Sequence, residues 1–254
     1  MGKIIAIANQ KGGVGKTTTA INLSACLGEK KKKILIVDSD PQGNTTSGLG
    51  ITAGDGSTTY DCLVNDVPIK EAMTKTDYPN LWLLAGSINL AGGEVELVDA
   101  ENREYRLKER LSEVKDDFDF IIIDCPPSLG LVTLNSLCAA DGVLIPIQCE
   151  YYALEGLSQL ARTVKTVRQT LNKELKIEGI LLTMYNSRTR LSEQVAEEVR
   201  KHFGAVVYDT VIPRNVRLSE APGYGQPITS FDKSSKGAKC YKKLAAEVIK
   251  KNSQ

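Results

Sequence analysis

The sequence predicts an α/β protein: a mainly parallel, twisted sheet with helices on both of its faces. Two observations support this fold class. Short apolar runs flanked by turn-forming or acidic residues recur along the chain, as is typical of buried strands. Longer stretches with helical character separate these runs. Parallel strands need long crossover connections, so this alternation favours helices that cover the two faces of one sheet.

The predicted elements alternate from the N-terminus onward, beginning with a strand at residues 4–8 and a helix at residues 18–27. Further strands are expected at residues 34–37, 81–84, 120–123, 143–147 and 180–184. Further helices are expected at residues 103–115, 154–171, 191–203 and 239–251. Sheets of this type bind ligands at the C-terminal ends of their strands, so functional residues are expected there.

The composition is that of a globular protein, with 42% hydrophobic and 25% charged residues in a chain of 254. No Pro/Gly/Ser-rich linker divides the chain, so we expect a single domain spanning residues 1–254. The formal net charge of +1 means that any nucleic-acid-binding surface must be a local patch. No secretory signal and no apolar run of roughly 18 residues is found, and we expect a cytoplasmic protein.

The most informative segment is a glycine-rich loop at residues 11–18, between the first predicted strand and helix. Its sequence is KGGVGKTT, and Asn9 stands where the GxxxxGK[ST] pattern has its first glycine. Glycines let backbone N–H groups converge on phosphate oxygens, and the following helix adds its positive N-terminal end. The loop predicts a P-loop NTPase, with the nucleotide bound by Lys11, Gly12, Gly13, Val14, Gly15, Lys16, Thr17 and Thr18.

The polar side chains of this loop have different expected roles. Lys16 is placed to contact the β and γ phosphates, and the Thr17 hydroxyl is a natural Mg²⁺ ligand beside them. Lys11 is one lysine more than nucleotide binding requires. A second ammonium near the γ phosphate suits the charge that develops there during phosphoryl transfer, so Lys11 and Lys16 are both candidate catalytic residues.

Aspartates follow two of the predicted strands. Residues 34–37 lead to Asp38 and Asp40 in a DSDPQGN turn, and residues 120–123 lead to Asp124. An aspartate at the end of a buried strand is the Walker B arrangement that holds Mg²⁺, often through water. Any one of these aspartates could instead cap a helix or satisfy a turn. Both acidic segments follow the phosphate loop in the expected order, and the combination indicates an ATPase.

These three segments, with QCEYYALEG at residues 148–156 and VIPRNVRLSEAP at residues 211–222, closely resemble the ParA/Soj partitioning ATPases. The likeness extends from Lys3 to about Ile249. KGGVGKTT matches the deviant Walker A signature of the wider ParA/MinD class, with Lys11 as its signature lysine. The resemblance implies that two subunits enclose two ATP molecules, each lysine reaching the nucleotide of its partner.

The resemblance also implies roles for single residues. Asp40 matches the aspartate that positions the attacking water, and we group it with Thr17 and Asp124 at the metal site. Pro213 and Asn215 match positions near the adenine or ribose. Asn186 follows another strand and is a further candidate for contact with the base, which completes the nucleotide-binding set.

Four arginines are candidates for DNA binding. Arg188 and Arg190 follow the strand that ends at residue 184, and Arg214 and Arg217 flank Asn215. Arginines clamp backbone phosphates, and pairing two subunits would double a patch that is weak in one. The resemblance implies nonspecific binding of duplex DNA. Alternatively, single arginines bind acidic residues of the same chain or lie at the dimer contact.

The leading hypothesis is an ATPase for chromosome or plasmid partitioning. ATP and Mg²⁺ binding would close a homodimer that binds DNA in the nucleoid, and hydrolysis would reset the monomer. The family further implies a ParB-like, centromere-bound partner that stimulates hydrolysis. No residue of the chain identifies that partner.

Two alternatives stay open. In a MinD-like ATPase, the C-terminal helix at residues 239–251 would bind membrane reversibly through apolar side chains such as Leu244 and Val248. We favour packing of this face on the core, because it lacks Trp and Phe. In a redox protein like the nitrogenase iron protein, cysteines would hold an iron–sulfur cluster. The six cysteines of this chain are scattered, without a CxxC pair, which argues against such a cluster.

Overall fold

The computed structural model describes residues 2–54 and 56–253, and its strands form one seven-stranded sheet. The strands are β1 (Lys3–Ile7), β2 (Ile34–Asp38), β3 (Thr74–Lys75), β4 (Leu81–Leu84), β5 (Phe120–Asp124), β6 (Gly142–Gln148) and β7 (Lys176–Thr183). Their order is β3-β4-β2-β5-β1-β6-β7, and only β3 and β4 pair in antiparallel fashion. The predicted mainly parallel sheet is confirmed.

Helices connect these strands. Those at predicted positions are α1 (Lys16–Glu29), α6 (Arg106–Ser112), α8 (Ala153–Thr170), α9 (Arg190–Phe203) and α12 (Lys236–Asn252). The others are α2 (Asn44–Gly48), α3 (Thr59–Val64), α4 (Ile69–Ala72), α5 (Leu90–Glu96), α7 (Leu131–Ala139), α10 (Val216–Glu220) and α11 (Ile228–Phe231). The longest unpredicted helix, α7, has nine residues. Helices this short show too few turns for an apolar period to stand out in the sequence.

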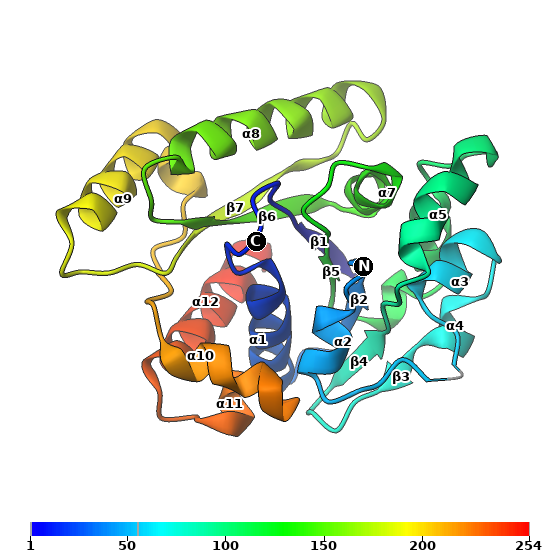
Figure 1. Ribbon diagram of the computed structural model, residues 1–254, viewed down its shortest axis with the longest axis horizontal. Coiled ribbons are helices and arrows are strands. Elements are labelled where there is room, and N and C mark those ends of the chain that lie inside the picture. The colour runs from blue at the N-terminus through cyan, green and yellow to red at the C-terminus, as the bar shows by residue number, and fades with distance from the viewer. Residues whose placement is uncertain (1, 55, 254) are drawn as a thin grey trace.

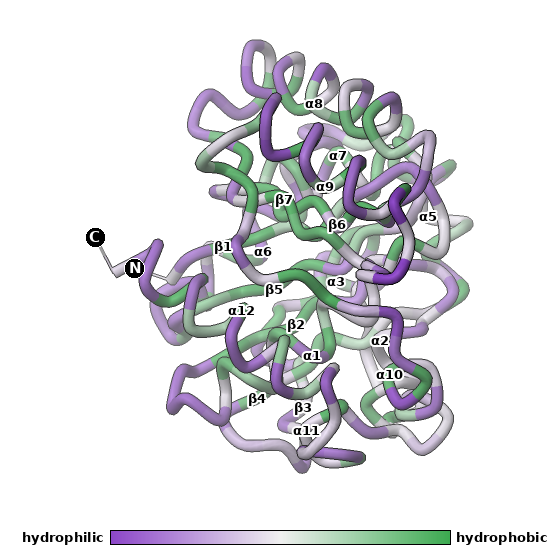
Figure 2. Tube along the Cα trace, turned by 90° about the vertical axis from the view of Figure 1, so that its left-hand side faces the viewer, coloured by the Kyte–Doolittle hydropathy of each residue, from purple (hydrophilic) through white to green (hydrophobic). Residues whose placement is uncertain are grey.

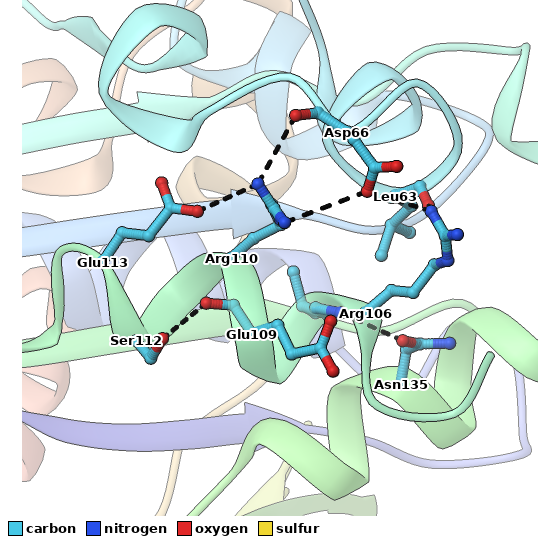
Figure 3. Close-up of polar contacts among 9 residues, drawn as sticks. Leu63, Asp66, Arg106, Glu109, Arg110, Ser112, Glu113 and Asn135 are labelled. Carbon is cyan, nitrogen blue, oxygen red and sulfur yellow. Dashed lines mark hydrogen bonds and ion pairs between the residues drawn. The ribbon is translucent and has the colours of Figure 1, made fainter. Parts of the chain in front are cut away.

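The helix predicted at residues 103–115 is shorter in the structure, where α6 covers only the central part of that range. Arg106 and Arg110 of α6 reach across to the loop after α3 (Figure 3). Arg106 donates to the Leu63 carbonyl and to the Asp66 carboxylate, at 3.2 and 3.0 Å. Arg110 pairs with Asp66 and with Glu113 of its own turn. These contacts tie α6 to α3 in the helical layer.

β1 shows how the sheet is buried on both faces. Its side chains Ile5 and Ile7 pack in the core formed with α1 and α12, whereas Ile4 and Ala6 pack in the core formed with α6, α7 and α8. Successive side chains of a strand point to opposite faces, so an uninterrupted apolar run fills two cores at once. In Figure 1, α1 and α12 lie together below the sheet and α8 lies above it.

Hydropathy follows the same layers. Figure 2 shows the central strands as a hydrophobic band and α8 with hydrophilic segments on its outer side. In the described part of the chain, no helix is both long and apolar enough to cross a membrane.

The candidate site lies at the C-terminal ends of the central strands. β1 is followed by α1 on one face of the sheet, and β5 is followed by α7 on the other. Connections that leave neighbouring parallel strands toward opposite faces open a crevice at that edge. Asp124 at the end of β5 is in register with Asp38 of β2 and with Ile7 of β1.

Candidate active site

The glycine-rich loop connects β1 to α1 and shapes the first part of the site. Gly13 and Gly15 adopt the left-handed conformation, with φ of +73° and +92°. Residues with a Cβ rarely adopt this conformation, so the backbone of the loop favours glycine at these two positions. No side chain caps the N-terminus of the 14-residue α1. Its first N–H groups and its positive dipole end are available to an anion.

A cavity of about 370 Å³ lies in front of this helix end. Lys16, Thr17 and Asp40 line it together with the loop glycines. Lys16 is buried, with 7% of its surface exposed. Burial lowers the pKa of Lys16, and the neighbouring carboxylates Asp124 and Asp40 act in the opposite direction. A phosphate in this cavity would meet a dehydrated cation, where electrostatic attraction is stronger than in water.

Asp124 occupies the floor of the site, at the end of β5. Its Oδ2 accepts hydrogen bonds from the hydroxyls of Thr17 and Thr45, both at 2.8 Å. Its Oδ1 is buried and has no hydrogen-bond partner among the described residues. Burial, with Asp38 nearby, raises the pKa of Asp124 to about 7. A bound dication would favour the charged form of the Asp124 carboxyl, and its water shell could donate to the unpartnered Oδ1. These donors therefore fit Mg²⁺ bound directly by Thr17 and through water by Asp124.

Asp38 holds the acidic turn in place. Its Oδ2 accepts from the backbone N–H and the hydroxyl of Thr46 at 2.8 and 2.7 Å, and its Oδ1 accepts from the Asp40 N–H at 3.2 Å. Burial raises the pKa of Asp38 to about 6. Asp40 itself lies at the cavity, where its Oδ1 accepts from the Gln42 N–H at 3.0 Å.

A second cavity of about 300 Å³ shares Gly15, Thr18 and Met184 with the first. Pro213 and Asn215, the two positions that the resemblance assigns to the adenine or ribose, line this second cavity. The Oδ1 atom of Asn215 is buried and has no hydrogen-bond partner in residues 2–54 and 56–253, which leaves an acceptor for an amino group. Asn186 is exposed, accepts a hydrogen bond from the Arg188 N–H at 3.1 Å, and lies outside the described lining of both cavities.

Lys11 lies at the rim. Its Nζ is 3.0 Å from Glu150 Oε2, and both side chains are nearly half exposed, at 47% and 45%. Glu150 follows β6 and also accepts from the Gln148 side chain. Lys11 is outside the described lining of the phosphate cavity, so within one chain this lysine is directed to Glu150.

The four arginines fall on two segments that backbone hydrogen bonds join: Arg188 precedes Arg190 at the start of α9, and Arg214 precedes Arg217 in α10. The Tyr185 N–H donates to the Ile212 carbonyl at 3.0 Å, and the Arg214 N–H donates to the Tyr185 carbonyl at 3.2 Å. Arg214 also lines the second cavity. The structure therefore brings the two predicted basic segments into one region.

The arginines differ in their partners. Arg217 pairs with Glu220 at 2.9 Å and Asp232 at 3.6 Å, and its guanidinium lies over the Phe231 ring. Arg188 and Arg190 are exposed, and neither has an ion pair with a carboxylate in the described ranges. The alternative to DNA binding, in which an arginine binds acidic residues of its own chain, therefore applies to Arg217.

Sequence reasoning missed Thr45 and the supporting role of Asp38. A DxD turn points to a pair of acidic residues but does not distinguish the one that faces the cavity from the one that holds the turn. Thr45 gave no signal, because 79 residues separate it from Asp124.

The alternatives raised by the sequence can be compared with this geometry. Tyr241, Leu244, Ala245 and Val248 of α12 are buried in the core against α1, as favoured from the sequence. Five cysteines are buried and Cys240 is partly buried, and no pair forms a disulfide. Within residues 2–54 and 56–253, no group of three His, Cys, Asp or Glu residues is arranged to hold a metal. Magnesium held mainly by phosphates and water requires no such group.

Known proteins resemble this chain in sequence and in structure. A family described as an AAA domain matches residues 2–177. The sporulation initiation inhibitor protein Soj of Bacillus subtilis is 59% identical over 249 residues, covering 98% of each chain. The chromosome-partitioning ATPase Soj of Treponema pallidum is 53% identical over 254 residues, covering 100% of each chain.

The fold comparison agrees with these relatives. A crystal structure of cobyrinic acid a,c-diamide synthase from Mycobacterium smegmatis, with bound ADP and magnesium, has a TM-score of 0.87 and 39% identity. It covers 100% of this chain and 96% of its own. Identity of this extent over the whole sequence establishes the family, and the chain belongs to the ParA/Soj chromosome-partitioning ATPases of the P-loop fold.

Proposed function

We propose that this single-domain ATPase is a dimerising switch that moves chromosomal or plasmid DNA. ATP with Mg²⁺ closes a homodimer, the dimer binds duplex DNA without sequence specificity, and hydrolysis returns the subunits to monomers. A ParB-like, centromere-bound protein stimulates hydrolysis, and the switch works in the cytoplasm on the nucleoid. One observation carries the nucleotide part: buried Lys16 and the Thr17–Asp124 pair lie together at the uncapped start of α1.

In the proposed reaction, Lys16 and the backbone N–H groups of the loop hold the β and γ phosphates. Thr17 and Asp124 hold Mg²⁺, which neutralises charge that develops on the phosphoryl group. Asp40 lines the same cavity and orients the attacking water. Pro213 and Asn215 hold the nucleoside in the second cavity.

Lys11 acts on the nucleotide of the partner subunit. Support comes from its position: within one chain it is directed to Glu150 and not into the phosphate cavity. Its release from Glu150 would let a second ammonium approach the γ phosphate, where it offsets developing charge. ATP occupancy and dimer formation are thereby coupled.

DNA binding is assigned to Arg188, Arg190 and Arg214, with a smaller part for Arg217. The exposure of the first two and the backbone hydrogen bonds between the two segments support this assignment. Two copies of the patch in a dimer would contact more phosphates than one copy can. DNA affinity would therefore depend on ATP.

The test measures molar mass by light scattering and retention on nonspecific duplex DNA in parallel, with no nucleotide, ADP, ATP or a nonhydrolysable ATP analogue. We expect a dimer and retention with the analogue, and a monomer without retention in ADP. Equal molar mass in all four conditions would contradict the switch. A further arm tests flotation with lipid vesicles in the presence of ATP. If the protein floats, and if flotation persists in Arg188→Glu but is lost in Leu244→Ala, the proposed DNA binding would be replaced by membrane binding.

Asp40→Ala provides a trapped state for the same assays. The variant should bind ATP and Mg²⁺ and stay dimeric on DNA, because only the orientation of water is lost. Hydrolysis should fall by about 100-fold or more. A normal hydrolysis rate would remove Asp40 from the mechanism.

A further inference from the structure

Thr45 and Thr17 approach the same oxygen of Asp124. Each hydroxyl donates to Oδ2 at 2.8 Å, although Thr17 begins α1 and Thr45 lies in α2. Thr45 and Asp124 are both 0% exposed. The other oxygen, Oδ1, has no partner among the described residues.

This distribution of donors is poor for stability alone. A buried carboxylate oxygen without a partner is destabilising, and a hydroxyl placed at Oδ1 would offset part of this cost. Both donors instead hold Oδ2 and leave Oδ1 open. Such an arrangement suits a carboxylate that must accept from an additional group, such as the water shell of Mg²⁺.

The two donors are not equivalent. The Thr17 hydroxyl is the expected direct ligand of Mg²⁺, so its orientation is set by the metal as well as by Asp124. Thr45 lies outside the described lining of the phosphate cavity, and its hydroxyl donates to Asp124. The hydrogen bond from Thr45 therefore orients the Asp124 carboxylate independently of metal binding.

Thr45 also connects the two acidic segments of the site. It lies in the first turn of α2, directly after the turn that carries Asp40. Its neighbour Thr46 donates to Asp38 at 2.7 Å, so α2 is attached to both buried carboxylates by adjacent threonines. These hydrogen bonds link the Asp124 carboxylate to the segment that follows the Asp40 turn.

We propose that Thr45 is a positioning residue of the magnesium site, which fixes Asp124 with Oδ1 open and ties the Asp40 turn to that carboxylate. The inference rests on the proposed binding of ATP with Mg²⁺. Residues of this kind, which orient a metal-binding group, typically change metal affinity by about 10- to 100-fold when removed.

The test titrates Mg²⁺ into the protein with a fluorescent ATP analogue and repeats analogue binding in EDTA. Thr45→Val removes the hydroxyl at nearly constant volume, and Thr45→Ala removes it without added bulk. Both variants should raise the Mg²⁺ concentration at half-saturation by about 10-fold or more, with affinity in EDTA unchanged. Thr45→Ser keeps the hydroxyl and should return the midpoint to within about 3-fold of wild type.

Thr76→Val is the control, because it removes another buried threonine hydroxyl, which donates to the Leu81 carbonyl at 2.9 Å away from the site. Its Mg²⁺ midpoint should stay near that of wild type. A wild-type midpoint in both Thr45 variants, an equal loss of affinity in EDTA, or the same shift in Thr76→Val would overturn the proposal. If the unmodified protein binds no ATP analogue, the proposed function fails instead.

Discussion

The floor and the rim of the site are built differently. On the floor, Asp124 and Asp38 are fully buried and receive hydrogen bonds from threonines of 2.7 to 2.8 Å, and Lys16 is also buried. On the rim, Lys11 is about half exposed in an ion pair with Glu150, and Arg188 is exposed.

This difference separates two tasks. The floor groups are buried, and Asp124 and Asp38 have fixed hydrogen-bond partners, so one chain holds these carboxyls in a defined geometry. The rim groups keep most of their hydration, and an exposed ion pair is worth only about 0 to 1 kcal/mol. In the proposed switch, they would exchange partners when a second subunit or DNA binds. Nucleotide binding would then depend mainly on groups of one chain, and DNA binding on the assembly.

Lys16→Ala is expected to give the largest effect, because it removes the buried cation that lines the phosphate cavity. Truncating one partner of a buried, charged binding contact costs about 2 to 5 kcal/mol, so the dissociation constant for ATP should rise at least about 30-fold. Isothermal titration calorimetry measures this change.

Lys11→Ala is the rim counterpart and should keep ATP binding while losing ATP-dependent dimerisation. Similar ATP affinities for Lys16→Ala and wild type would erase the distinction between floor and rim.

Removal of the exposed arginines should weaken DNA binding next. Arg188→Ala removes a charged group that binds phosphate, for which about a 10-fold loss of affinity is expected. The slope of log affinity against log salt should fall by about 0.9 for each phosphate that the variant no longer neutralises. Arg217→Ala should change affinity by less than about 3-fold, because Glu220 and Asp232 already hold that side chain. Equal effects of the two substitutions, or a salt-insensitive complex, would contradict the proposed patch.

The floor should also show in the pH dependence of stability. The pKa of Asp124 is raised to about 7 and that of Asp38 to about 6, in both cases first by burial. The folded, metal-free protein therefore binds more protons than the unfolded chain between about pH 4 and pH 7. The contribution of these carboxyls to the free energy of unfolding is present at low pH and is lost as pH rises through that window.

Asp124→Asn removes one of these titrations and keeps an acceptor for the two threonines. In EDTA, its Tm at pH 8 should exceed that of wild type by on the order of 5 °C, with little difference at pH 5. Differential scanning calorimetry at both pH values measures the comparison. A lower Tm for the variant at pH 8 would show that the charged Asp124 carboxylate stabilises the metal-free folded protein.

The smallest effect is expected at the rim ion pair. Glu150→Gln weakens the hold on Lys11 and should tighten the ATP-dependent dimer by up to about 5-fold, since an exposed pair contributes less than about 1 kcal/mol. Light scattering over a concentration series gives the dissociation constant. A weaker dimer would mean that Glu150 itself contacts the partner subunit.

The sequence by itself determined the elements whose signals are local. Uninterrupted apolar runs predicted the buried strands, and the glycine loop predicted the turn before α1, because strand burial and left-handed glycines depend on adjacent residues. The order of the loop, Asp40 and Asp124 was also sufficient to place them at one edge of a parallel sheet. Their chemical roles remain predictions.

Only the tertiary structure decided which side chains meet. Thr45 reaches Asp124 across 79 residues, and Lys11 reaches Glu150 across 139. It also placed Asn186 outside the described lining of both cavities and gave Arg217 two acidic partners. Such contacts depend on strand order and on the angle at which each loop leaves the sheet. Neither property is encoded in the spacing of a few residues, so geometry alone separated a buried floor from an exposed rim.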